Sequence, residues 1–115
     1  MIIENALYIV ATPIGNLADM SARAIDILKA CDLIAAEDTR HSARLMQHFG
    51  IGTHMQAYHD YSSSDRAQEI VNRIFAGSRV ALISDAGAPL ISNPGYRIVK
   101  VAKDRGVNVI SVPGA

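Results

Sequence analysis

The chain has 115 residues, half of them hydrophobic, and its 11 basic residues balance its 11 acidic ones. This length fits one domain with a hydrophobic core, and the lack of a basic excess excludes a module that binds nucleic acid through its overall charge. The single cysteine excludes a disulfide framework and a cysteine-rich zinc site.

The cysteine and the N-terminus indicate the compartment. Cys31 lies near hydrophobic residues, which predicts a buried structural thiol, and a lone thiol fits a reducing cytosol. The N-terminus carries no basic segment of a signal peptide, and no hydrophobic run has the length of a membrane span. We therefore expect a cytoplasmic protein that does not contact a membrane.

The chain opens with a strand, a loop and an amphipathic helix. A continuous hydrophobic run over residues 6–11 predicts a strand buried on both faces. Proline, glycine and asparagine over residues 12–17 predict a loop. Ser21 is expected to cap the helix that follows. The inner face of that helix carries Ala24, Ile25, Leu28 and Cys31.

A second buried strand is expected over residues 33–36, followed by a second helix. Asp38 or Thr39 caps this helix, and Gly50 follows its last turn. Its buried side carries Leu45, Met46 and Phe49. Residues 54–58 predict a short third strand.

The rest of the chain repeats this alternation. Residues 62–65 open a third helix, residues 79–83 form a fourth strand, Asn93 and Pro94 start a fourth helix, and residues 107–112 form a fifth strand. Gly77 and Gly106 end the two helices. Their inward positions are Ile70, Val71, Ile74 and Phe75 in the third helix and Ile98, Val99 and Ala102 in the fourth. The alternation predicts an α/β fold: an open, mostly parallel five-stranded sheet with helices on both faces.

Three polar loops follow predicted strands, over residues 12–17, 37–41 and 84–95. The carboxyl ends of parallel strands meet at one edge of the sheet, where α/β proteins bind their ligands. The sequence therefore predicts one composite site at this edge. It contains no dinucleotide-binding glycine fingerprint, Walker loop or nucleophile elbow, and the spacing of its four histidines gives no reason to expect a metal site.

The loop over residues 84–95 consists of small residues, prolines and one carboxylate, Asp85. Gly87 allows a close backbone approach, and the prolines stiffen the chain. Two interpretations are open from these residues alone: an ordinary strand-to-helix turn, or one wall of a small-molecule site.

The loop over residues 37–41 places a carboxylate, Glu37, directly after a buried strand. Glu37 is either a base or hydrogen-bond acceptor for a substrate, or the partner of Arg40 in an ion pair that fixes the loop. Arg40, Arg44 and His48 share one helix face. That face is either merely solvated or a contact for a phosphate backbone.

Three segments resemble the signatures of a known family. Residues 7–17 are similar to the opening of the tetrapyrrole (corrin/porphyrin) methylases, in particular the branch that methylates a cytidine 2′-hydroxyl of small-subunit (16S) ribosomal RNA. Residues 35–40 and 84–95 resemble the second and third signatures of that branch. Ala88 and Asn93 depart from it, since Thr and Asp are common there, although Asn also caps a helix.

The resemblance implies S-adenosylmethionine as methyl donor, a homodimer and no need for a metal. It implies donor contacts from the first and third loops, at Pro13, Gly15, Asp85, Ala86, Gly87 and Ile91. For the substrate, the small ribosomal subunit, Glu37 is expected to be the base or orienting acceptor. Arg40 and His41 are expected to contact phosphate or ribose.

The resemblance also implies that residues 1–115 form an N-terminal domain, with the donor bound between it and a C-terminal domain. We expect this piece alone to be inactive. Two alternatives stand beside this expectation: a methylase of corrin or porphyrin intermediates, and a non-enzymatic ligand-binding α/β domain. The signature at residues 37–40 favours RNA over a tetrapyrrole.

Overall fold

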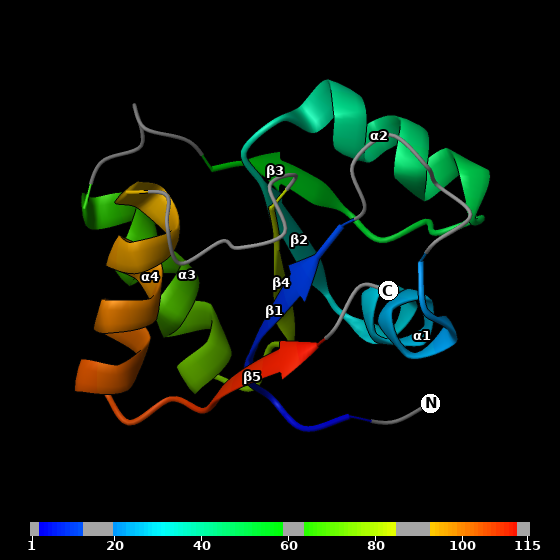
Figure 1. Cartoon of the computed structure of the whole chain (residues 1–115). Helices are drawn as coiled ribbons and strands as arrows, with labels where there is room; N and C mark the ends of the chain where they lie inside the picture. The colour runs from blue at the N-terminus through cyan, green and yellow to red at the C-terminus, as the bar shows by residue number, and fades with distance from the viewer. Residues whose placement is uncertain (1–2, 13–19, 59–63, 85–92, 113–115) are drawn as a thin grey trace.

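The computed structural model describes residues 3–12, 20–58, 64–84 and 93–112, with residues 64, 84 and 93–96 described by their backbone alone. Strands and helices alternate along these residues, as the sequence predicts (Figure 1). The strands are β1 (Leu7–Ala11), β2 (Leu33–Ala36), β3 (Met55–Ala57), β4 (Val80–Ser84) and β5 (Val109–Val112). The helices are α1 (Ala22–Ala30), α2 (Thr39–His48), α3 (Ser64–Phe75) and α4 (Asn93–Asp104).

The strands form one sheet in the order β3-β2-β4-β1-β5, and all the neighbouring strands are parallel. Helices α1 and α2 cover one face of the sheet, and α3 and α4 cover the other (Figure 1). The predicted open α/β sheet with helices on both faces is therefore confirmed. Within the described residues, no helix has the length and hydrophobicity needed to cross a membrane.

Two hydrophobic cores hold the helices to the sheet, because successive strand side chains point to opposite faces. In β1, Tyr8 and Val10 join the core under α1 and α2, whereas Leu7 and Ile9 join the core under α3 and α4. A strand covered on both faces needs hydrophobic residues at every position. This is why residues 6–11 read as one continuous hydrophobic run.

The predicted termini of the first two helices are confirmed. The Ser21 hydroxyl accepts a backbone amide of the first turn of α1 at 3.1 Å. Asp38, and not Thr39, caps α2, because its Oδ1 accepts two backbone amides at 3.0 and 3.2 Å. Gly50 follows α2 with a φ of 66°, a left-handed conformation that favours glycine after a helix.

Cys31 is buried, as predicted. It follows α1 and closes the helix by donating its amide to the Ile27 carbonyl. Burial is the main reason that the pKa of its thiol rises to about 12. The thiol therefore stays protonated at neutral pH, which fits a structural role.

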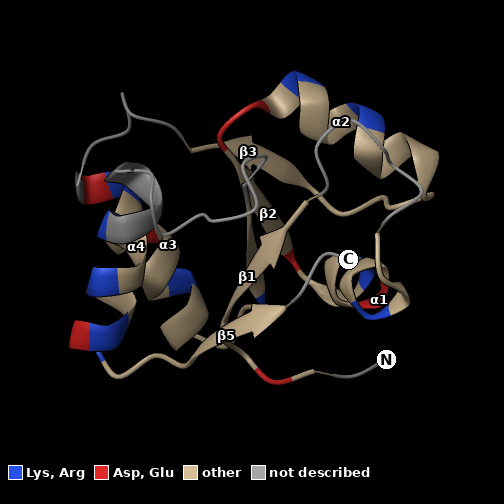
Figure 2. Ribbon diagram, viewed as in Figure 1, with Lys and Arg blue, Asp and Glu red and all other residues tan. Residues whose placement is uncertain are grey.

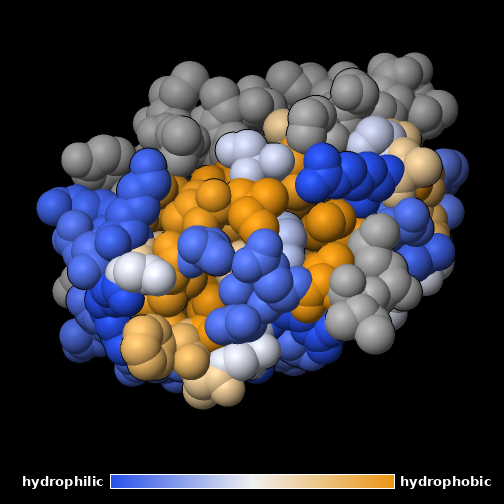
Figure 3. Space-filling view, turned by 90° about the horizontal axis from the view of Figure 1, so that it is seen from below, coloured by the Kyte–Doolittle hydropathy of each residue, from blue (hydrophilic) through white to orange (hydrophobic). Residues whose placement is uncertain are grey.

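Phe75 was expected to face inward, and this prediction is wrong, because 65% of its surface is exposed. Phe75 is the last residue of α3, and its neighbour Ile74 fills the core position. The Arg105 guanidinium lies 5.7 Å from the centre of the ring and covers it in part. Figure 3, a view from the amino ends of the strands, shows hydrophobic side chains between hydrophilic ones on this surface.

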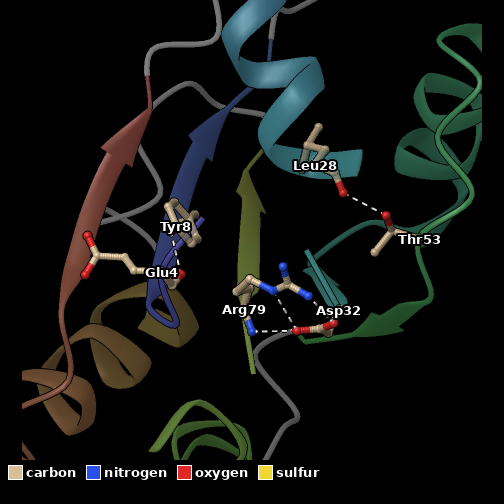
Figure 4. A network of polar contacts seen from close by, with 6 residues as sticks. All are labelled: Glu4, Tyr8, Leu28, Asp32, Thr53 and Arg79. Carbon is tan, nitrogen blue, oxygen red and sulfur yellow. Dashed lines mark hydrogen bonds and ion pairs between the residues drawn. The ribbon is translucent and has the colours of Figure 1, made fainter. Parts of the chain in front are cut away.

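Polar contacts fasten the amino ends of the strands (Figure 4). The Arg79 side chain donates to both carboxylate oxygens of Asp32, at 3.0 and 3.1 Å, and its amide donates to one of them at 2.8 Å. The Tyr8 hydroxyl donates to the Glu4 carbonyl at 2.6 Å. These contacts fix the end of the sheet opposite the predicted site.

Candidate functional site

The strand order creates a switch point between β1 and β4. After β1 the chain runs through α1 toward β2, on one side of the sheet, whereas after β4 it runs through α4 to β5, on the other side. Because α1 and α4 cover opposite faces, the two connections diverge. Open α/β sheets bind ligands in the crevice at such a point, outside the carboxyl ends of the strands. We therefore place the candidate site at the carboxyl ends of β1 and β4.

The two loops expected to hold the donor follow these two strands. Residues 13–19 follow β1 and residues 85–92 follow β4, and both segments lie outside the described residues. The donor contacts on them therefore stay predictions: Pro13, Gly15, Asp85, Ala86, Gly87 and Ile91. Ala11 at the end of β1 pairs with Ser84 at the end of β4, so both loops leave the sheet from neighbouring positions.

Glu37 lies at the same edge. It follows Ala36, the last residue of β2, and Ala36 pairs with Ile83 of β4. The next residue of β4, Ser84, pairs with the last residue of β1. The strand ends from which the three predicted loops depart are thus consecutive in the sheet.

The structure has several buried polar atoms without a hydrogen-bond partner in the described part of the chain, among them Glu37 Oε1 after β2 and the Tyr58 hydroxyl after β3. Tyr58 follows β3, and its amide donates to the Ala36 carbonyl at 2.8 Å, next to Glu37. Burial raises the pKa of the Tyr58 phenol, which therefore stays neutral and able to donate. An unsatisfied buried polar group costs about 1–3 kcal/mol, so such atoms call for a functional explanation.

The structural alternative for Glu37 is not observed. Ion pairs among the described residues join Arg66 to Glu69, Arg79 to Asp32 and Lys100 to Asp104. Within those residues, no ion pair joins Glu37 to Arg40. Arg40 is exposed on α2, whereas Glu37 Oε1 is buried, so the two groups lie in different environments.

The two expected substrate contacts, Arg40 and His41, form the first turn of α2. Their backbone amides donate to Asp38, so the Asp38 carboxylate serves as the helix cap. Arg40 is exposed and His41 is half-buried. The described residues bring together no group of three or more side chains that could hold a metal ion.

Tyr58 is a candidate site residue that the sequence does not predict. Its position gives the same signal that marked Glu37, a polar group at the carboxyl end of a predicted strand. A tyrosine there also reads as an ordinary strand residue, because its ring packs well in a core. Only the structure shows that its hydroxyl has no partner among the described residues.

Residues 6–115 match the family described as Tetrapyrrole (Corrin/Porphyrin) Methylases. Proteins named "Ribosomal RNA small subunit methyltransferase I" are 49% identical over 111 residues in Escherichia coli O157:H7 and 51% identical over 109 residues in Synechocystis sp.. These alignments cover 96% and 95% of this chain but 39% of each relative. The chain thus spans about two fifths of the length of these relatives.

Solved structures share the fold at low identity. A cobalt precorrin-4 methyltransferase of cobalamin biosynthesis has a TM-score of 0.76 at 18% identity, covering 96% of this chain and 46% of that one. A uroporphyrin-III-C-methyltransferase from Thermus thermophilus has a TM-score of 0.73 at 14% identity, covering 96% of this chain and 48% of that one. Together with the match over nearly the whole sequence, this fold shows that the chain belongs to the tetrapyrrole (corrin/porphyrin) methylase family.

Proposed function

We propose that this chain is part of an S-adenosylmethionine-dependent methyltransferase that modifies a cytidine 2′-hydroxyl in small-subunit (16S) ribosomal RNA. The observation that carries the proposal is the buried Glu37 carboxylate oxygen at the carboxyl edge where β1 and β4 end, which has no partner among the described residues. Relatives that are about half identical over nearly the whole chain are named as ribosomal RNA methyltransferases, and they favour RNA as the substrate class.

The described residues at this edge fit a polar ligand, because the orphaned Glu37 Oε1 accepts hydrogen bonds and the neutral Tyr58 hydroxyl also donates them. S-adenosylmethionine, when bound, supplies a reactive methyl group on a positively charged sulfur. We assign its binding to residues of the loops after β1 and β4: Pro13, Gly15, Asp85, Ala86, Gly87 and Ile91. The Asp85 carboxylate would favour the cationic amino-acid end of the donor.

Glu37 is assigned to the substrate. A ribose hydroxyl is a weak nucleophile until its proton is removed or held by an acceptor. Glu37 Oε1 takes that proton or orients it while the hydroxyl oxygen gains the methyl group. Arg40 and His41, at the first turn of α2, contact the phosphate or ribose beside the reacting nucleotide. Because the transfer is a displacement in line with the leaving sulfur, much of its rate depends on this positioning.

The same proposal covers assembly and location. Residues 1–115 form the N-terminal domain of a cytoplasmic homodimer, and a C-terminal domain completes the donor site. The length of the relatives supports the presence of a second domain, since each relative is more than twice as long as the segment aligned with this chain. The reaction needs no metal.

A methylase of a corrin or porphyrin is the second candidate, because two such enzymes share the fold. Their identities of 18% and 14% weigh less than the 49% and 51% of the ribosomal RNA methyltransferases. Methyl transfer distinguishes the two. The complete gene product is incubated with methyl-labelled donor and either unmodified small ribosomal subunits or a porphyrinogen. We expect 2′-O-methylcytidine in the subunit RNA; label in the porphyrinogen alone would support the second candidate.

The role of Glu37 is tested in the complete gene product by Glu37→Gln. Loss of a general base lowers a rate by roughly 10²–10⁴-fold, and we expect a single-turnover rate reduced in that range. Donor affinity, measured by calorimetry, should stay unchanged. Asp38→Asn is the matched control, because it neutralises the adjacent carboxylate and keeps the helix cap. An unchanged methylation rate in Glu37→Gln would exclude this role.

A further inference from the structure

Helix α2 carries positive charge and no acidic residue. Its sequence from Thr39 to His48 contains two arginines and two histidines. Arg40, Arg44 and His48 are exposed and lie one turn apart on one side of the helix, which we call the α2 basic face. Figure 2 shows the two arginine positions on the outer side of α2, with no acidic position between them.

The arginines of this face have no partner in the described part of the chain. Some surface cations of the other helices lie beside carboxylates, as Arg66 does beside Glu69 and Lys100 beside Asp104. By contrast, neither Arg40 nor Arg44 makes an ion pair or side-chain hydrogen bond with a described residue. Their guanidinium groups are therefore available to an external anion.

The opposite side of α2 fixes the direction of this face. Ser42, Leu45 and Met46 are buried against the sheet, so Arg40 and Arg44 are held on the outside. Arg40 is three residues after Glu37, and the face runs outward from the candidate site along the helix. Successive members are separated by about 6 Å along the helix axis, one turn of helix.

Two exposed arginines one helical turn apart, next to a site, suit a linear polyanion. Guanidinium groups bind phosphates through paired hydrogen bonds. The net charge of this chain is zero, so any attraction that these 115 residues have for nucleic acid comes from a local surface such as this one. Resting on the proposed function, we propose that the α2 basic face binds the phosphate backbone of the substrate RNA strand and guides it toward Glu37.

The test measures RNA binding by the complete gene product. Fluorescence anisotropy with a labelled fragment of small-subunit ribosomal RNA gives the dissociation constant over a range of salt concentrations. Arg40→Gln with Arg44→Gln removes two charges from the face. The matched control, Arg73→Gln with Lys103→Gln, removes two exposed charges from α3 and α4 on the other face of the sheet. Circular dichroism confirms that each variant is folded.

We expect the α2 variant to bind RNA on the order of tenfold more weakly. The slope of log affinity against log salt concentration is negative, and its magnitude should decrease by about 1.4, as for two lost phosphate contacts to a single strand. The control should change neither quantity. Arg44→Gln alone should raise KM for small subunits and leave kcat unchanged, because Arg44 lies a turn away from the site. Arg40→Lys with Arg44→Lys should restore most of the salt slope.

The outcomes separate this inference from the proposed function. Methyl transfer to small subunits, with affinity and salt slope unchanged in the α2 variant, would overturn the inference and the contact assigned to Arg40, and would leave the methyltransferase function standing. If the complete gene product transfers no methyl group but binds RNA in a way that depends on Arg40 and Arg44, the RNA-binding role of the α2 basic face is supported and the proposed function is overturned. Equal losses in the α2 variant and the control would also overturn the inference, because they would reflect overall charge.

Discussion

At the carboxyl edge of the sheet, Glu37 and Tyr58 each bury an oxygen atom that has no hydrogen-bond partner among the described residues. Glu37 is conspicuous, because a carboxylate directly after a buried strand has no packing role. Tyr58 is inconspicuous in the sequence, because a tyrosine at the end of a strand is explained by packing of its ring as well as by a function of its hydroxyl. Whether a hydroxyl is buried without a partner depends on residues distant in the sequence, so no local pattern encodes it.

Tyr8 and Tyr58, both buried, give a matched test of this point. The Tyr58 hydroxyl has no partner in the described residues, whereas the Tyr8 hydroxyl donates to the Glu4 carbonyl at 2.6 Å. Removing an unsatisfied buried group is neutral or favourable, and removing a satisfied one costs about 1 kcal/mol. We predict that Tyr58→Phe leaves the free energy of unfolding equal or higher and that Tyr8→Phe lowers it, as measured by urea denaturation. Destabilisation by Tyr58→Phe of the same size would show that its hydroxyl is paired.

Helix starts are predictable where the contacts that make them are local. Asp38 caps α2 through amides two and three residues ahead, so the sequence alone identifies the cap region. The prediction that Phe75 is buried is wrong because helical periodicity defines one face of a helix but does not show at which residue the helix extends beyond the core. The link between β2 and β4 through Asp32 and Arg79 joins residues 47 positions apart, and no local pattern predicts it.

The Asp32–Arg79 link makes stability depend on pH. Hydrogen bonds from Arg79 hold the pKa of the Asp32 carboxyl below its ordinary value of 3.8. The ion pair therefore contributes its full stabilisation of the folded state above the ordinary pKa of 3.8, and this contribution is lost as the pH falls through the lower pKa of the folded state. We predict that Asp32→Asn lowers Tm at pH 7 and that the difference narrows in acid below about pH 4. Asp104→Asn, in an exposed pair with a distance of 3.5 Å, should change Tm less. A Tm difference between the wild-type protein and Asp32→Asn that does not change with pH would contradict a role for the Asp32 charge.

Over the whole molecule, the sequence predicts a shared edge but not its arrangement. Parallel strands bring their following loops to one edge, so the convergence of the three loops follows from the fold class alone. The order β3-β2-β4-β1-β5 does not follow from it, because it depends on pairings between distant strands. That order makes β1 and β4 neighbours and directs their connections to opposite faces. The switch point thus rests on tertiary structure, whereas the choice of these two loops as donor contacts follows from the family resemblance of the sequence.

The most direct measurement locates the donor in the protein. The complete gene product is irradiated with labelled S-adenosylmethionine, and the crosslinked peptides are identified by mass spectrometry, with excess unlabelled donor as the control for specificity. We predict crosslinks in the segments after β1 and β4, residues 13–19 and 85–92. Specific crosslinks confined to the amino ends of the strands, around Glu4, Phe75 and Asn108, would contradict a donor site at the β1–β4 crevice.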